Sequence, residues 1–284
     1  MPTFNMNRTW SQAVALFQAN FQLLAVIGGV FLLLPSLLLY MALPDFFSTL
    51  SMADGNPEQM EAMVLAMVGP LALYGSIAFV LQMVGYMAMI ALMGDDRPTV
   101  GEAILEGLRS LFSVIAATLL FVVLYVVLAL VVSLVMGLIV AATGGSEAIA
   151  GVLAFVLVIG LLVGTFYLAV RLSLTMPVIV LERRRNPFDA LRRSWQLTAG
   201  HAARIFAFFL LLFVAYMVLS LVILGIFGGA VTAVGGPGDA SVFVTGLLNG
   251  VVGALVAMLF SAILVGLYRQ LAGSSSVQID ETFG

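Results

Sequence analysis

Apolar residues run almost without interruption through this 284-residue chain, and short polar segments divide them into six stretches. A membrane-spanning helix needs about 20 consecutive apolar residues, and each stretch reaches that length. The predicted spans are residues 22–43, 62–93, 111–142, 148–180, 202–234 and 241–268. The expected fold class is therefore all-α: a polytopic membrane protein with six transmembrane helices in a single integral membrane domain, 1–284, that ends in a short polar tail, 269–284.

The composition indicates that lipid is the solvent for most of the chain. Hydrophobic residues make up 63% and charged residues 9%, and the mean hydropathy is +1.19, whereas an average soluble domain is about 25% charged. The chain has no cysteine and one histidine, His201. These counts exclude a disulfide framework, a thiolate nucleophile and a zinc site built from several histidines. We expect no cofactor, no metal and no nucleic-acid partner.

The basic residues, all arginine, are distributed unevenly along the chain. Ten of the eleven lie before the first span, between the second and third, around the junction of the fourth and fifth, or after the sixth. The connecting loops 44–61, 143–147 and 235–240 contain no arginine and carry acidic residues instead. Positively charged loops stay on the cytoplasmic side of a membrane. Both termini and the polar tail are therefore predicted to be cytoplasmic.

Three cytoplasmic segments share a sequence pattern: TWSQAVALF from Thr9, TVGEAILEG from Thr99 and NPFDALRRS from Asn186. Each opens with a residue that favours a helix N-cap, followed three positions later by Gln, Glu or Asp and then by alanine, as in a capping box. Similarity at a fixed period of about 90 residues indicates repeated structural units. We expect three repeats, approximately 9–93, 99–180 and 186–268, each a cytoplasmic interfacial helix plus a transmembrane hairpin.

Each of the three segments is amphipathic, with large apolar side chains at helical spacing. The predicted apolar faces comprise Trp10, Val14, Phe17 and Phe21; Val100, Ile104, Leu108 and Leu111; and Phe188, Leu191, Trp195 and Thr198. A helix of this kind lies in the headgroup region with its apolar side toward the lipid. An ordinary elbow that leads into the next span has the same pattern, so both interpretations stay open.

The segment after the fourth span carries a family resemblance. A proline followed by ALRRSW, LTAG and another long apolar helix resembles the glycerophosphoryl diester phosphodiesterase membrane-domain family, and the YciC-type six-span inner-membrane proteins are similar. The resemblance implies a multi-pass protein of the bacterial cytoplasmic (inner) membrane. In fusions of that family the phosphodiesterase activity resides in a separate soluble barrel, which this chain lacks. We therefore expect no enzymatic activity and carry over no catalytic residue.

Arg171 lies inside the fourth predicted span, about ten residues or ~15 Å from its cytoplasmic end. An arginine at mid-membrane costs roughly 2.5–3.5 kcal/mol on insertion scales, and no Asp or Glu lies within a predicted span to pair with it. Three kinds of partner stay open: the Ser173 carbonyl, which Pro177 leaves without its hydrogen bond; a lipid or substrate phosphate; or a polar side chain such as Gln82, Tyr86, Tyr167 or Asn249. The alternative is that Arg171 reaches the interface without a function.

Five arginines lie between residues 183 and 193, and each can contribute about 1 kcal/mol of attraction to an anionic leaflet. We therefore predict that Arg171, Arg192, Arg193 and Arg204 bind lipid phosphate. The alternative is that this cluster only fixes the orientation of the chain.

The expected function is that of a non-enzymatic, lipid-interacting or envelope-organising protein whose partners are membrane lipids, in particular anionic ones. A homo-oligomer or an envelope protein partner stays open as well. The alternative function is a transporter or permease for small molecules or lipids. Proline kinks and an intramembrane arginine favour it, whereas the absence of intramembrane acids and the common orientation of the repeats disfavour it.

Overall fold

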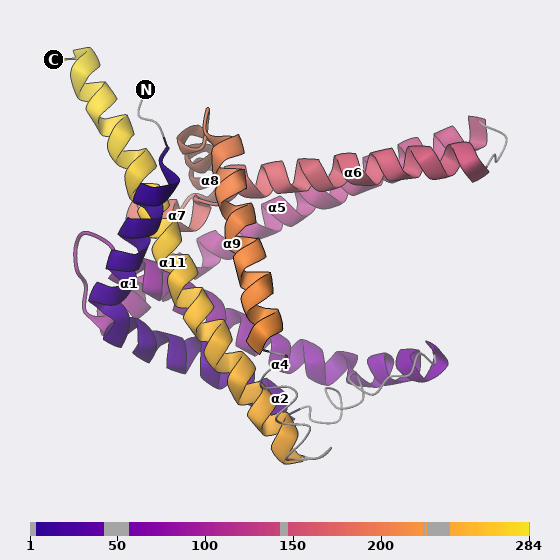
Figure 1. Ribbon diagram of the computed structural model, residues 1–284, viewed down its shortest axis with the longest axis horizontal. Helices are drawn as coiled ribbons and strands as arrows, with labels where there is room; N and C mark the ends of the chain where they lie inside the picture. The colour runs from indigo at the N-terminus through magenta and orange to yellow at the C-terminus, as the bar shows by residue number, and fades with distance from the viewer. Residues whose placement is uncertain (1–3, 43–56, 143–146, 224, 226–238, 284) are drawn as a thin grey trace. The chain divides into compact units, whose positions relative to one another are not determined.

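The computed structural model describes residues 4–42, 57–142, 147–223, 225 and 239–283, and every regular element in these ranges is helical (Figure 1). The elements in chain order are α1 (Met6–Gly28), the π-helix η1 (Gly29–Leu33), α2 (Leu34–Ala42), α4 (Pro57–Leu92), α5 (Val100–Ala142), α6 (Glu147–Leu172), α7 (Thr175–Leu181), α8 (Pro187–Leu197), α9 (Ala202–Ile223) and α11 (Asp239–Phe283). The expected all-α class is confirmed.

Six helical segments of the described chain are long and apolar enough to cross a membrane: Met6–Leu39, Met67–Leu92, Val100–Ala141, Gly151–Leu181, Ala202–Ile223 and Phe243–Gly273. They correspond one to one with the six predicted spans. Of the acidic residues in the arginine-free loops, Asp45 and Asp54 lie outside the described residues, whereas Glu58, Glu61, Glu147 and Asp239 belong to α4, α6 and α11.

The first two amphipathic segments differ from the expectation of separate interfacial helices. Residues 9–21 belong to α1 and residues 99–111 lead directly into the rest of α5. Only the third segment forms a helix of its own, α8, which ends in a turn before α9. Gly200 in that turn has φ +77°, a conformation that glycine adopts without a steric penalty. The C-terminal tail likewise continues α11 as a helix to Phe283.

The described chain forms two compact units. One comprises Phe4, Phe112–Leu210 and α11 from Tyr268 onward. The other comprises the described residues of Asn5–Leu111 and Leu211–Leu267. In the second unit α4 packs against α1, η1 and α2, and in the first unit α8 packs against α6 and α7.

Two N-caps were predicted correctly, and one was not. Thr99 and Glu102 form a reciprocal capping box, since the Thr99 backbone N–H donates to Glu102 Oε2 (2.8 Å) and the Glu102 N–H donates to Thr99 Oγ1 (3.4 Å). The prediction for Thr9 is wrong. Asn5 caps α1 by accepting from the Arg8 N–H, 3.1 Å away, so the helix begins before Thr9. Thr9 instead donates to the Asn5 carbonyl from within the helix.

The amphipathic segments pack through small side chains rather than through the predicted apolar faces. Ala13, Ala103 and Ala190, at equivalent positions of the sequence pattern, are each 0% exposed. Large apolar residues of the predicted faces stay exposed: Trp10, Phe21, Leu108, Phe188 and Trp195. Small side chains let two helix backbones approach closely, which explains why they form the buried edge.

Two of the spans contact the amphipathic segment that follows them in the chain. The two contacts join residues that are the same distance apart in sequence. In the second unit, a Cβ added to Gly107 would lie 2.8 Å from the Val84 carbonyl oxygen, 23 residues earlier. In the first unit, the Ser194 hydroxyl donates to the Arg171 carbonyl, also 23 residues earlier, at 2.8 Å. The first amphipathic segment has a close contact of another kind: a Cβ at Gly266 of α11 would lie 3.3 Å from the Thr9 carbonyl oxygen.

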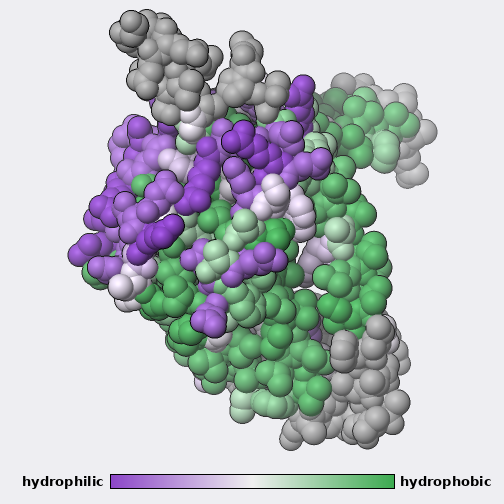
Figure 2. Space-filling view, turned by 60° about the vertical axis from the view of Figure 1, so that its left-hand side comes forward, coloured by the Kyte–Doolittle hydropathy of each residue, from purple (hydrophilic) through white to green (hydrophobic). Residues whose placement is uncertain are grey.

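The spans differ in how much of their surface the protein itself covers. The most apolar windows of Val100–Ala141 and of Gly151–Leu181 contain no buried residue. In Met67–Leu92 and Phe243–Gly273 more than half of the corresponding window is buried. Figure 2 shows broad areas of hydrophobic side chains on the visible face, with hydrophilic side chains gathered apart from them. A surface this apolar requires lipid around it.

Candidate functional site

The fourth span is broken near its C-terminal end, and the break determines where Arg171 lies. Helix α6 ends at Leu172 and α7 begins at Thr175. Pro177 lacks an N–H and its ring clashes with the carbonyl four residues earlier, at Ser173, so one continuous helix is disfavoured. Arg171 is therefore in the last turn of α6 rather than in the middle of a straight span. There its charge complements the helix dipole.

Arg171 is held by two aromatic residues. Its Nε donates to Tyr167 Oη at 3.1 Å, and its Nη1 donates to the Trp195 carbonyl at 3.1 Å. The guanidinium carbon lies 4.3 Å from the centre of the Trp195 ring and 5.5 Å from that of Tyr167, within cation–π range. The two rings meet edge to face. Tyr167 was among the predicted partners, but Trp195, which approaches from α8, was not.

The backbone of Arg171 also anchors α8. The Ser194 and Thr198 hydroxyls donate to its carbonyl oxygen at 2.8 and 3.2 Å. Both side chains are fully buried, although Thr198 was predicted to share a face with Phe188. The last carbonyl groups of an α-helix have no partner within the helix. Because α6 ends one residue after Arg171, its carbonyl is one of these, and the Ser194 and Thr198 hydroxyls supply its hydrogen bonds.

Local sequence starts α8 in the predicted way. Asn186 Oδ1 accepts from the Phe188 N–H at 3.1 Å, and Pro187 occupies the first turn. Asp189 adds a negative charge in that turn, where the helix dipole favours it. The predicted cap is therefore confirmed.

The exposed face of α8 has an aromatic edge beside a basic one. Phe188 is 66% exposed and Trp195 37%. Arg192 lies about one helical turn after Phe188, next to these aromatic residues, and is also exposed. The opposite face, with Ala190, Ser194, Leu197 and Thr198, is buried. Aromatic residues beside arginine on an exposed helix face are typical of a membrane–water interface.

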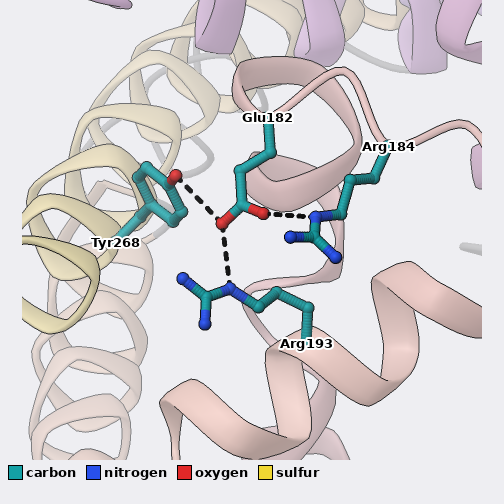
Figure 3. Close-up of polar contacts among 4 residues, drawn as sticks. All are labelled: Glu182, Arg184, Arg193 and Tyr268. Carbon is teal, nitrogen blue, oxygen red and sulfur yellow. Dashed lines mark hydrogen bonds and ion pairs between the residues drawn. The ribbon is translucent and has the colours of Figure 1, made fainter. Parts of the chain in front are cut away.

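Glu182, just after α7, is the centre of a second polar cluster (Figure 3). Its Oε2 lies 2.6 Å from Arg184 Nε, and its Oε1 lies 3.1 Å from Arg193 Nε on α8. Tyr268 of α11 donates its hydroxyl to the same Oε1 at 3.2 Å. The Glu182 side chain is 15% exposed. This cluster, Glu182 with Arg184, Arg193 and Tyr268, is called the Glu182 cluster below.

The four predicted lipid-binding arginines thus have different surroundings. Arg171 and Arg193 have partners within the protein. Arg192 and Arg204 are exposed, and no hydrogen bond or ion pair joins either side chain to another described residue. Within the part of the chain that the structure describes, no group of three or more His, Asp or Glu side chains is placed to hold a metal ion.

Sequence reasoning did not identify Glu182 and Tyr268. The signal available for Glu182 was a lone acid beside three consecutive arginines, which predicts an ion pair but does not say with which arginine. Tyr268 is 86 residues away in sequence, and no local pattern connects it to Glu182.

The six apolar helices define the class of this chain, a multi-pass helical membrane protein. A family model, a domain of unknown function (DUF7847), matches residues 8–271, so the chain belongs to that family. Neither a curated protein nor a solved structure matches the chain.

Proposed function

We propose that this protein is a non-enzymatic inner-membrane protein that binds anionic phospholipid at its cytoplasmic side through α8. The observation that carries the proposal is the exposed face of α8, with Phe188 and Trp195 next to Arg192. Exposed aromatic side chains enter the headgroup region, and an adjacent arginine meets phosphate there with a bidentate fork. The resemblance to the glycerophosphoryl diester phosphodiesterase membrane-domain family supports a lipid ligand.

The four arginines have separate roles in this proposal. Arg192 and Arg204 meet the headgroups directly because both are exposed. Arg171 holds Trp195 and the α8 backbone in position, while Arg193 belongs to the Glu182 cluster. Each exposed arginine adds about 1 kcal/mol of attraction to an anionic surface.

Native mass spectrometry of the purified protein tests the proposal. The wild type is compared with Arg192→Gln/Arg204→Gln in a mixture of phosphatidylglycerol and phosphatidylcholine. The expected result is that the wild type retains phosphatidylglycerol preferentially and that the double variant loses most of this preference. Arg8→Gln/Arg109→Gln is the control, since it removes two exposed arginines from the other amphipathic segments. Equal lipid retention by all three proteins would reject the proposal.

The proposed architecture has both termini in the bacterial cytoplasm and three repeats. Two facts support the repeats: the buried alanines Ala13, Ala103 and Ala190 recur at equivalent positions, and two span-to-segment contacts share a separation of 23 residues. In this arrangement the amphipathic segments lie at one membrane surface, where their exposed aromatic and leucine side chains meet lipid.

A transporter is the second candidate, because two spans have broken helices. The π-helix η1 interrupts the first span just before Pro35, and the fourth span breaks at residues 173–174. Interrupted spans expose backbone groups that bind substrate or ions in many transporters. Solute uptake and export by cells with and without the protein, measured against a Pro35→Ala variant, separate the two candidates. A change in flux without a change in lipid retention favours transport.

A further inference from the structure

The Glu182 cluster contains the donors of an anion-binding site, and the anion that they surround is the carboxylate of Glu182 itself. Two guanidinium groups and one phenol, from three separate segments of the chain, converge on a single carboxylate (Figure 3). Donors of this kind are those that bind phosphate in proteins. The cluster lies at the end of α7, close in sequence to α8, whose exposed face carries the proposed lipid contact.

The two arginines use only part of their hydrogen-bonding capacity on Glu182. Each pairs with the carboxylate through its Nε. Among the described residues, no other hydrogen bond or ion pair engages the Nη groups of Arg184 or Arg193. A guanidinium has five N–H donors, so four remain on each arginine. A carboxylate and a phosphodiester each accept with two free oxygens, whereas a terminal phosphate presents three.

The cluster is also accessible. The side chains of Arg184 and Arg193 are 49% and 27% exposed, and that of Glu182 is 15% exposed. Among the pairs of the cluster, the one with Arg184 is the more exposed and contributes at most about 1 kcal/mol to stability. A phosphate group that takes the place of the Glu182 carboxylate leaves both arginines paired with an anion, so the exchange does not leave a buried charge without a partner.

We propose that Arg184, Arg193 and Tyr268 form a phosphate-binding site that the Glu182 carboxylate occupies when no ligand is bound. Glu182 then acts as an internal competitor that sets the affinity of the site. The inference rests on the proposed function, because it adds a second phosphate site near the lipid contact at α8. Glu182 and the ligand compete for this second site. The ligand chemistry is a phosphate group, carried by a lipid headgroup or by a small soluble phosphate.

The experiment is a titration of full-length protein in neutral detergent with phosphatidylglycerol, followed by native mass spectrometry. Glu182→Gln removes the competing charge and keeps the size of the side chain. Asp189→Asn is the matched control, because it makes the same charge change nearby without touching the cluster. The expected result is at least about a fivefold lower apparent Kd for Glu182→Gln, a typical magnitude for coupled binding, and an unchanged Kd for Asp189→Asn.

A second pair of variants keeps the test open if Glu182→Gln fails to fold. Arg184→Gln removes one donor and is expected to raise the Kd several-fold, whereas Arg185→Gln, with the same charge loss at the next residue, is expected to leave it unchanged. The inference is overturned if Glu182→Gln behaves like Asp189→Asn, or if Arg184→Gln behaves like Arg185→Gln. If the wild type shows no preference for phosphatidylglycerol at all, the proposed function itself is rejected.

A competition arm identifies the source of the phosphate. Inorganic phosphate and glycerol 1-phosphate are added to the complex of Glu182→Gln with phosphatidylglycerol. Displacement of the lipid at millimolar concentration shows that the site takes a small soluble phosphate. Displacement by phosphatidylglycerol-containing vesicles alone shows that it takes a lipid headgroup. The inference is overturned if neither the soluble phosphates nor the vesicles displace the bound lipid.

Discussion

The guanidinium of Arg171 lies over the indole of Trp195, 4.3 Å from the ring centre, and donates to the carbonyl of the same residue. The two residues are 24 positions apart and belong to different helices, α6 and α8. This double contact fixes the side chain and the backbone of Trp195 together. Arg171 is thereby the residue through which the end of the fourth span positions α8.

We expect Arg171→Gln to lower the stability of the protein by about 2–3 kcal/mol. The variant loses a cation–π contact of up to about 2 kcal/mol and hydrogen bonds from a charged donor of about 1.5–3 kcal/mol each, part of which water and Gln replace. Arg171→Lys keeps the charge but loses the planar guanidinium with its fixed donors. We therefore expect it to lower the stability less than Arg171→Gln does. Thermal unfolding in detergent measures both variants. A melting temperature like that of the wild type for Arg171→Gln would contradict this role.

Two glycines of α5 provide a matched pair for the close contact with α4. A Cβ at Gly107 would lie 2.8 Å from the Val84 carbonyl oxygen, whereas a Cβ at Gly101 meets nothing within 4 Å. We expect Gly107→Ala to destabilise the protein by about 1–3 kcal/mol through overpacking. Gly101→Ala should be neutral or stabilising by up to about 1 kcal/mol, because alanine favours a helix. Equal unfolding midpoints for the two variants would argue against the contact.

The chain contains two tryptophans, Trp10 and Trp195, which makes the depth of α8 measurable. In Trp10→Phe, all indole fluorescence comes from Trp195. If the aromatic edge of α8 enters the headgroup region, lipids with a quencher near the headgroup should reduce this emission more than lipids quenched deep in the acyl chains. Trp195→Phe reports on Trp10 in the same way. Quenching that is strongest at the bilayer centre would exclude an interfacial position.

The absence of native cysteine lets single cysteines report the topology. We expect Ser51→Cys and Ser146→Cys, in arginine-free loops, to react with a membrane-impermeant maleimide added to intact cells. Ser275→Cys in the C-terminal tail should react only after the cells are permeabilised, because arginine-rich segments stay cytoplasmic. The reverse labelling pattern would overturn the predicted orientation of the chain.

The features that sequence predicted well depend on local interactions. The number and order of the spans follow from runs of apolar residues, and the caps at Thr99 and Asn186 follow from contacts within three residues. The cap of α1 was missed because two side chains suited to capping, Asn5 and Thr9, lie one turn apart. The repeat pattern favoured Thr9, whereas the structure uses Asn5.

The features that sequence did not predict depend on contacts between distant segments. The amphipathic pattern placed Phe188 and Trp195 on one face, but it did not say that they stay exposed, and it wrongly placed the buried Thr198 with them. The signal that was present is the alanine shared by all three segments, since a recurrent small residue indicates close backbone approach. The partners of Arg171 and Glu182 lie on other helices, and only the three-dimensional arrangement brings them together.

The close contacts of the amphipathic segments have a consequence for the order in which the protein assembles during synthesis. Contacts such as Val84 with Gly107 join residues that leave the ribosome close together, so each forms early. The contact between Thr9 and Gly266 joins the first helix to the last, about 250 residues later, which is roughly 10–50 s at usual rates of translation. During that interval α1 has α4 as a partner but lacks α11. The edge of α1 at Thr9 and Ala13 is therefore completed only when the last helix of the chain has been made.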